Sequence, residues 1–153
     1  MSTPPNLRAT VRALVLPAER VLLVGVRGFG QSVTCEVATL AELPEEAERF
    51  DAIVWLVRAG LDGALARLRR LLRPSGLLVV WVEPTGMAAQ VWSALSGAPA
   101  RTSVALEEVC EALVLVGLLT PRVMGRGPRG FAVCGTMPAH PDTLDALFEQ
   151  PAP

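Results

Sequence analysis

Three glycines, Gly25, Gly28 and Gly30, are the residues whose type and spacing could bind a cofactor. They lie at the end of the continuous apolar run Val21–Val26 and in the turn that follows it, RGFGQ. A residue without Cβ lets the backbone and a ligand approach each other closely. Arg27, in the same turn, adds a cation that could bind a phosphate. The pattern makes the three glycines the candidate cofactor-binding residues.

Cysteine and histidine offer little further chemistry. Cys35, Cys110 and Cys134 show no C-x-x-C spacing, and each falls within an expected strand or amphipathic helix. Packed, reduced thiols are therefore expected rather than disulfides or metal ligands. The single histidine, His140, stands in a Pro-rich tail, which gives no basis for a metal centre or a His-dependent triad.

The composition favours one compact domain. Of 153 residues, 51% are hydrophobic and 19% are charged, which is too apolar for a disordered chain. No apolar run reaches the roughly 18 residues of a spanning helix, and no signal peptide is visible at the start. Arg is the sole basic residue, with 14 basic against 15 acidic side chains, which fits a bacterial, GC-rich genome and no nucleic-acid partner. We expect a cytoplasmic protein with no membrane partner.

The hydrophobic pattern alternates between strands and helices. Continuous apolar runs indicate strands buried on both faces, and apolar residues at helical spacing indicate amphipathic helices. The expected strands are Val21–Val26, Val33–Val37, Asp51–Val57, Leu77–Val82, and the hairpin arms Leu119–Met124 and Gly130–Met137. The expected helices are Asn6–Leu16, Leu61–Arg73, Met87–Leu95 and Leu106–Val116. This order predicts an α/β fold with a mostly parallel central sheet, helices on both faces and a C-terminal antiparallel hairpin.

Several segments carry a specific family resemblance. FDAIVWLV, the helix after it and RRLLRPSGLLVVWVEP resemble the centre of class I S-adenosylmethionine-dependent methyltransferases. ERVLLVGVRGFG resembles that family's first strand and glycine loop, VTCEVATLAELP its third strand, and LEEVCEALVLVGLLTPRVMGRGPRGFAVCG its last helix and hairpin. The resemblance covers residues 19–137 and implies a reduced Rossmann-like methyltransferase domain at 1–137. Residues 138–153 form a tail with one short expected helix.

The cofactor-binding half departs from the family pattern. Leu23 stands where the family's glycine loop begins with an acidic residue, and Arg27 and Phe29 stand where glycines are expected. Thr39 occupies the place of the Asp that contacts the adenine amine in the family. The resemblance therefore implies a pocket without most of its cofactor contacts. We expect no cofactor, no catalytic residues and no metal, with S-adenosylmethionine as the alternative cofactor.

A whole supersecondary unit is also missing. In the family, a helix, a strand and another helix lie between the first and third strands, and that second strand ends in the carboxylate that holds the ribose. Here Arg27–Ser32 alone separate the two expected strands, whereas a parallel crossover needs about a dozen residues. We therefore predict a compact turn at Arg27–Gln31 and an antiparallel Val33–Val37 at the sheet edge, where it would fill the ribose space.

These losses favour a non-catalytic pseudo-methyltransferase that serves as a protein-interaction or regulatory module. The alternative is a divergent small methyltransferase whose site is completed by a partner subunit. A third hypothesis is a different small ligand in the cleft at Gly25–Gly30. The expected partner is another protein, with a true enzyme as one option, or a second copy bound through the truncated sheet edge.

The candidate partner-binding residues lie in three places. Arg69 and Arg73 share a helix face away from most leucines and could meet an acidic partner. Trp92 could anchor an interface. In the tail, an apolar helix face of Leu144, Leu147 and Phe148 could enter a partner's groove or fold back onto the domain.

Overall fold

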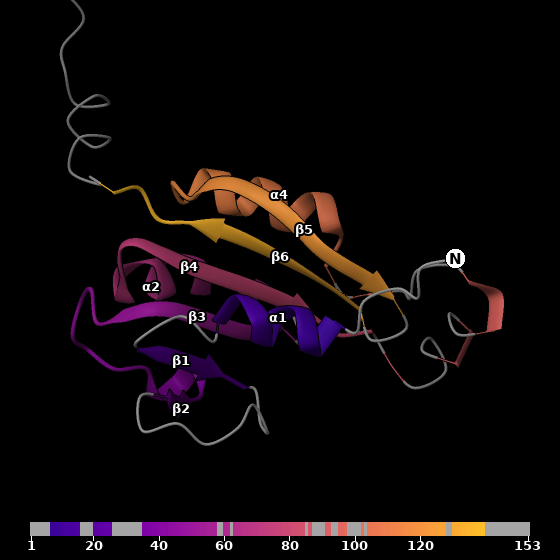
Figure 1. The fold of residues 1–153 in the computed structure, drawn as a ribbon, viewed down its shortest axis with the longest axis horizontal. Helices are drawn as coiled ribbons and strands as arrows, with labels where there is room; N and C mark the ends of the chain where they lie inside the picture. The colour runs from indigo at the N-terminus through magenta and orange to yellow at the C-terminus, as the bar shows by residue number, and fades with distance from the viewer. Residues whose placement is uncertain are drawn as a thin grey trace, which may run out of the picture.

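The computed structural model contains a six-stranded sheet flanked by helices (Figure 1). It describes residues 7–15, 20–25, 35–57, 60–61, 63–84, 86, 91–92, 95–97, 102, 104–127 and 130–139. The strands are β1 (Val21–Val24), β2 (Cys35–Ala38), β3 (Phe50–Val57), β4 (Leu72–Val82), β5 (Leu119–Gly127) and β6 (Gly130–Thr136). They are arranged in the order β2-β1-β3-β4-β6-β5.

The direction of the strands confirms the α/β prediction. Strands β2, β1, β3 and β4 run parallel to one another, and β6 is antiparallel to both β4 and β5. The three apolar runs expected to be central and parallel are β1, β3 and β4, and the expected hairpin is β5 with β6. The sequence expectation therefore holds for the sheet's centre and its C-terminal end.

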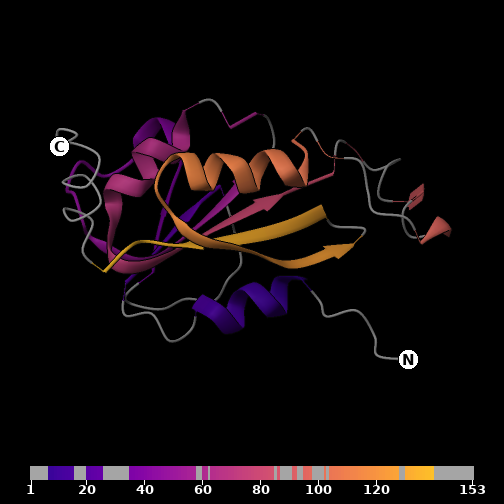
Figure 2. The same ribbon diagram turned by 90° about the horizontal axis from the view of Figure 1, so that it is seen from above.

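Helices cover both faces of the sheet. Figure 2 shows α1 (Leu7–Val15) on one side, with α2 (Ala64–Leu71) and α4 (Leu106–Leu115) on the other. Alternate residues of β1 enter two separate apolar clusters: Leu22 packs in the cluster under α2 and α4, and Leu23 in the cluster with Val11 of α1. A strand buried on both faces must be apolar at every position. This explains the continuous apolar runs, in which Trp55 and Trp81 are buried residues of the sheet.

The predicted antiparallel direction of Val33–Val37 is wrong. Strand β2 pairs parallel to β1, with Val21 opposite Cys35 and Val24 opposite Ala38. The prediction made both strands too long and so left too short a connection between them. Since β1 ends at Val24 and β2 begins at Cys35, residues 25–34 make the connection. At about 3.3 Å per residue they can span roughly 33 Å, whereas a four-residue strand is only about 13 Å long. The predicted turn at Arg27–Gln31 lies outside the described residues.

The end of the second expected helix also differs from the prediction. Helix α2 stops at Leu71, and Arg73 belongs to β4 instead of the helix. The strand then makes an irregular register shift opposite β3 before Leu77 resumes regular pairing. A Cβ added to Gly76 would lie 2.8 Å from the carbonyl oxygen of Arg73 and 3.2 Å from that of Asp51. The irregular segment therefore requires glycine at position 76, because the neighbouring backbones approach too closely for any side chain.

Candidate ligand-binding site

A pocket of about 420 Å³ opens where the carboxyl ends of three parallel strands meet. It is lined by Val24, Gly25, Thr39, Leu40, Trp55, Leu56, Val57, Gly60, Ala64 and Arg67. In the sheet, β1 lies between β2 and β3. The strand order reverses there, so the pocket at the carboxyl end of β1 lies at a topological switch point. In open α/β sheets, ligands bind in the crevice outside the carboxyl ends of the strands at such a point.

Gly25 shapes the first wall of the pocket. Its φ is +74°, a left-handed conformation that glycine adopts at no steric cost, and its N–H donates to the carbonyl oxygen of Ala38 at 3.1 Å. An added Cβ would make only an ordinary contact, 3.5 Å from the carbonyl oxygen of Leu56. The glycine is therefore needed for its backbone conformation, which ends β1 and joins it to the end of β2.

Arg67 brings a charge to this largely apolar pocket. It lies on α2, the helix that follows β3, and its Nη2 donates to the carbonyl oxygen of Leu40 at 2.7 Å. Among the described lining residues, Arg67 is the charged side chain and Thr39 the polar one, and none is a carboxylate. The pocket thus combines apolar walls with a guanidinium held at its rim.

The structure brings some of the sequence-predicted residues to the pocket. Gly25 and Thr39 line it, whereas Gly28 and Gly30 lie outside the described residues. Leu23, in the position of the family's acidic residue, is buried in the sheet. Sequence reasoning did not single out Arg67 as a site residue. No local signal distinguishes it from the other arginines of its helix, because its place at the pocket depends on how the helix packs.

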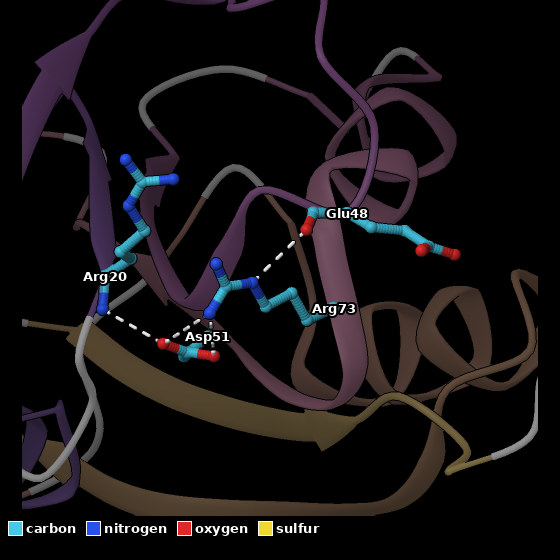
Figure 3. Close-up of polar contacts among 4 residues, drawn as sticks. All are labelled: Arg20, Glu48, Asp51 and Arg73. Atoms are coloured by element: carbon cyan, nitrogen blue, oxygen red, sulfur yellow. Dashed lines mark hydrogen bonds and ion pairs between the residues drawn. The ribbon is translucent and has the colours of Figure 1, made fainter.

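Arg73, a predicted docking residue, is part of a polar cluster at the opposite edge of the sheet (Figure 3). Its Nη1 lies 3.2 Å from Oδ1 of Asp51, and its Nε donates to the carbonyl oxygen of Glu48 at 3.3 Å. Asp51 also accepts a hydrogen bond from the backbone N–H of Arg20 at 3.0 Å. The guanidinium therefore joins β4 to the start of β3 and to the loop before it.

The other predicted docking residues have different surroundings. Arg69 is half-buried against Gly117, and its Nε is buried without a hydrogen-bond partner among the described residues. Trp92 is 70% exposed. Leu144, Leu147 and Phe148 lie outside the described residues.

In the described part of the chain, no group of three or more His, Cys, Asp or Glu side chains is placed to hold a metal ion. None of the helices described is long and apolar enough to cross a bilayer.

No family model and no curated relative matches the sequence, but solved structures resemble the fold. An S-adenosylmethionine-dependent methyltransferase from Thermotoga maritima, a possible histamine N-methyltransferase, is 17% identical; the match covers 84% of this chain and 86% of that chain, with a TM-score of 0.56. A second similar structure is the 1,6-didemethyltoxoflavin-N1-methyltransferase of Burkholderia thailandensis, with bound 1,6-didemethyltoxoflavin and S-adenosylhomocysteine. It is 14% identical, and the match covers 86% of this chain and 76% of that chain at a TM-score of 0.52.

A third similar structure is an S-adenosylmethionine-dependent methyltransferase from Mesorhizobium loti. It is 11% identical, and the match covers 86% of this chain and 98% of that chain at a TM-score of 0.56. Identities this low establish the fold alone. Together with the strand order and the antiparallel terminal hairpin, they show that this chain has the fold of class I S-adenosylmethionine-dependent methyltransferases.

Proposed function

We propose that this protein is a non-catalytic member of the methyltransferase fold and acts as a protein-interaction or regulatory module. The observation that carries the proposal is the chemistry of the pocket. S-adenosylmethionine carries a sulfonium and an ammonium beside a single carboxylate, so its net charge is positive, and the family resemblance implies protein carboxylates for its ribose and adenine. The described lining instead presents Thr39, apolar walls and the cation of Arg67.

The end of β2 supports the same proposal. Strand β2 pairs directly with β1, and the residues that follow β2 in the described pocket lining, Thr39 and Leu40, offer no carboxylate to hold a ribose. Each loss of about 1.4 kcal/mol weakens binding tenfold. Three or four missing contacts would bring S-adenosylmethionine affinity below a useful range.

Exposed apolar side chains support a protein partner. Val91, Trp92 and Leu95 are all more than half exposed and close together in sequence. Aromatic anchors such as tryptophan dominate the binding energy of many interfaces. At the edge of the sheet, Val37 of β2 is 64% exposed, which keeps a second copy of the chain as an alternative partner.

Thermal unfolding in the presence of S-adenosylmethionine tests the proposal. A ligand at one hundred times its Kd stabilises the native state by about 2.7 kcal/mol, which would raise the Tm of a domain of this size by roughly 5–10 °C. We expect no rise with 1 mM S-adenosylmethionine or S-adenosylhomocysteine. A rise of several degrees together with measurable methyl transfer would overturn the proposal.

A pull-down from native cell extract tests the interaction role, with Trp92→Ala as the matched variant. We expect the parent chain to retain a partner protein that the variant loses. Equal retention by both chains would exclude Trp92 as the anchor.

One observation favours the second candidate, a divergent methyltransferase completed by a partner subunit. Because β2 is parallel to β1, it does not fold back as a hairpin across the ribose space, and the pocket at the carboxyl edge stays open. The thermal test distinguishes the two candidates when it is repeated with the purified partner complex. Binding of S-adenosylmethionine by the complex alone would favour the enzyme.

A further inference from the structure

We propose that the pocket at the carboxyl edge binds a small molecule with an apolar body, one anionic group (a carboxylate, a sulfonate or a phosphate) and no cationic group. Arg67 would hold the anion, and the apolar walls would hold the body. The absence of a sulfonium and an ammonium distinguishes this ligand from S-adenosylmethionine, and the inference goes beyond the proposed interaction role.

The volume and lining of the pocket define the body of the ligand. A volume of about 420 Å³ is within the range of small-molecule sites, roughly 300–1,000 Å³. Val24, Trp55 and Val57, at the ends of β1 and β3, form an almost fully buried floor. The apolar surface open to a ligand comes from the half-buried Leu40 and Leu56. Such a surface favours an apolar group, because binding removes apolar area from water.

The guanidinium of Arg67 defines the polar end of the ligand. Arginine has five N–H donors in a planar fork that matches a carboxylate or a phosphate. In the described part of the chain, the side chain of Arg67 makes one hydrogen bond, to the carbonyl oxygen of Leu40, and no ion pair. Donors therefore remain for a ligand. The N-terminal end of α2, which begins at Ala64 in the same lining, adds a favourable potential for an anion.

The bond to Leu40 also prepares the site. It links the side chain of Arg67 to the segment that follows β2 and so favours a position of the guanidinium at the pocket rim. A side chain that already favours the bound position loses less conformational entropy when the ligand binds. The arrangement thus presents a cation beside an apolar cavity, which a cationic ligand would find unfavourable.

The test uses two fluorescent probes that share one aromatic body. The anionic probe is 1-anilinonaphthalene-8-sulfonate, and the neutral one is N-phenyl-1-naphthylamine. Arg67→Met removes the charge, and Arg70→Met is the matched control because Arg70 is exposed on the same helix and does not line the pocket. We expect Arg67→Met to weaken binding of the anionic probe about tenfold or more, and to change binding of the neutral probe less than twofold. Arg70→Met should change neither.

A third variant, Thr39→Phe, locates the bound probe by filling the pocket from its rim. We expect it to abolish saturable binding of both probes while the far-UV circular dichroism stays unchanged. The proposal is overturned if Arg67→Met leaves the anionic probe within twofold of the parent, if Arg70→Met has an equal effect, or if Thr39→Phe leaves both probes bound. These outcomes are independent of the S-adenosylmethionine test, so the two proposals can fail separately.

Discussion

Arg73 and Arg67, at opposite ends of the parallel strands, differ in how their guanidinium groups are bonded. At the amino edge, Arg73 is paired with Asp51 and also hydrogen-bonded to the backbone of Glu48, so its polar atoms serve the fold. At the carboxyl edge, Arg67 bonds to one backbone carbonyl and faces a pocket. The difference follows from the fold, because parallel strands bring their ligand-binding crevice to the carboxyl edge. The charge of Arg73 is therefore used within the fold, whereas the charge of Arg67 lines a pocket.

The largest expected effect is on the packing of the amino edge. Gly76→Ala places a Cβ 2.8 Å from the carbonyl oxygen of Arg73 and should destabilise the domain by about 2–3 kcal/mol. The matched control is Gly86→Ala, since a Cβ there meets no atom within 4 Å. Urea unfolding measures both. An equally small effect at the two glycines would contradict the close approach of backbones at position 76.

The next effect concerns the carboxylate at the centre of the polar cluster. Asp51→Ala leaves the guanidinium of Arg73 and the backbone N–H of Arg20 without their acceptor. We expect the free energy of unfolding to fall by about 1–3 kcal/mol. Affinity for the anionic probe at the other edge should stay within twofold. A large loss of probe binding in a variant that remains folded would show that the two edges are not separate in function.

A smaller effect separates the two arginines directly. Arg73→Met removes an ion pair with a half-buried carboxylate and should cost about 1 kcal/mol of stability. Arg67→Met removes one exposed hydrogen bond to a carbonyl, and we expect a cost of about 0.5 kcal/mol or less. Paired urea titrations of the two variants measure the difference. The comparison fails if Arg67→Met proves the more destabilising of the two.

The sequence was most informative where burial alone decides the structure. Strand β3 and residues 77–82 of β4 are apolar at nearly every position because both of their faces are covered, so these runs predict central strands. The direction of β2 was not predictable by the same argument. It depends on where two short strands end, and an error of two residues at Val24 and at Cys35 reversed the conclusion about the connection.

The candidate site was predictable only in part. Gly25 follows an apolar strand, and that position alone places it at the carboxyl edge. Arg67 is one of several arginines on its helix, and no local pattern distinguishes it from Arg70. The two arginines differ in their position around the axis of α2. The packing of Leu65 and Leu68 in the core sets the rotation of the helix, and with it the side on which each arginine lies. The orientation toward the pocket is therefore a tertiary property.

Isothermal titration calorimetry measures the affinity of the chain for S-adenosylmethionine without requiring a substrate. We expect no saturable heat with the purified chain at millimolar S-adenosylmethionine, whereas the anionic naphthalene probe binds in the same buffer. A micromolar Kd for S-adenosylmethionine, lost in Thr39→Phe, would place the cofactor in this pocket and contradict the proposed loss of cofactor binding.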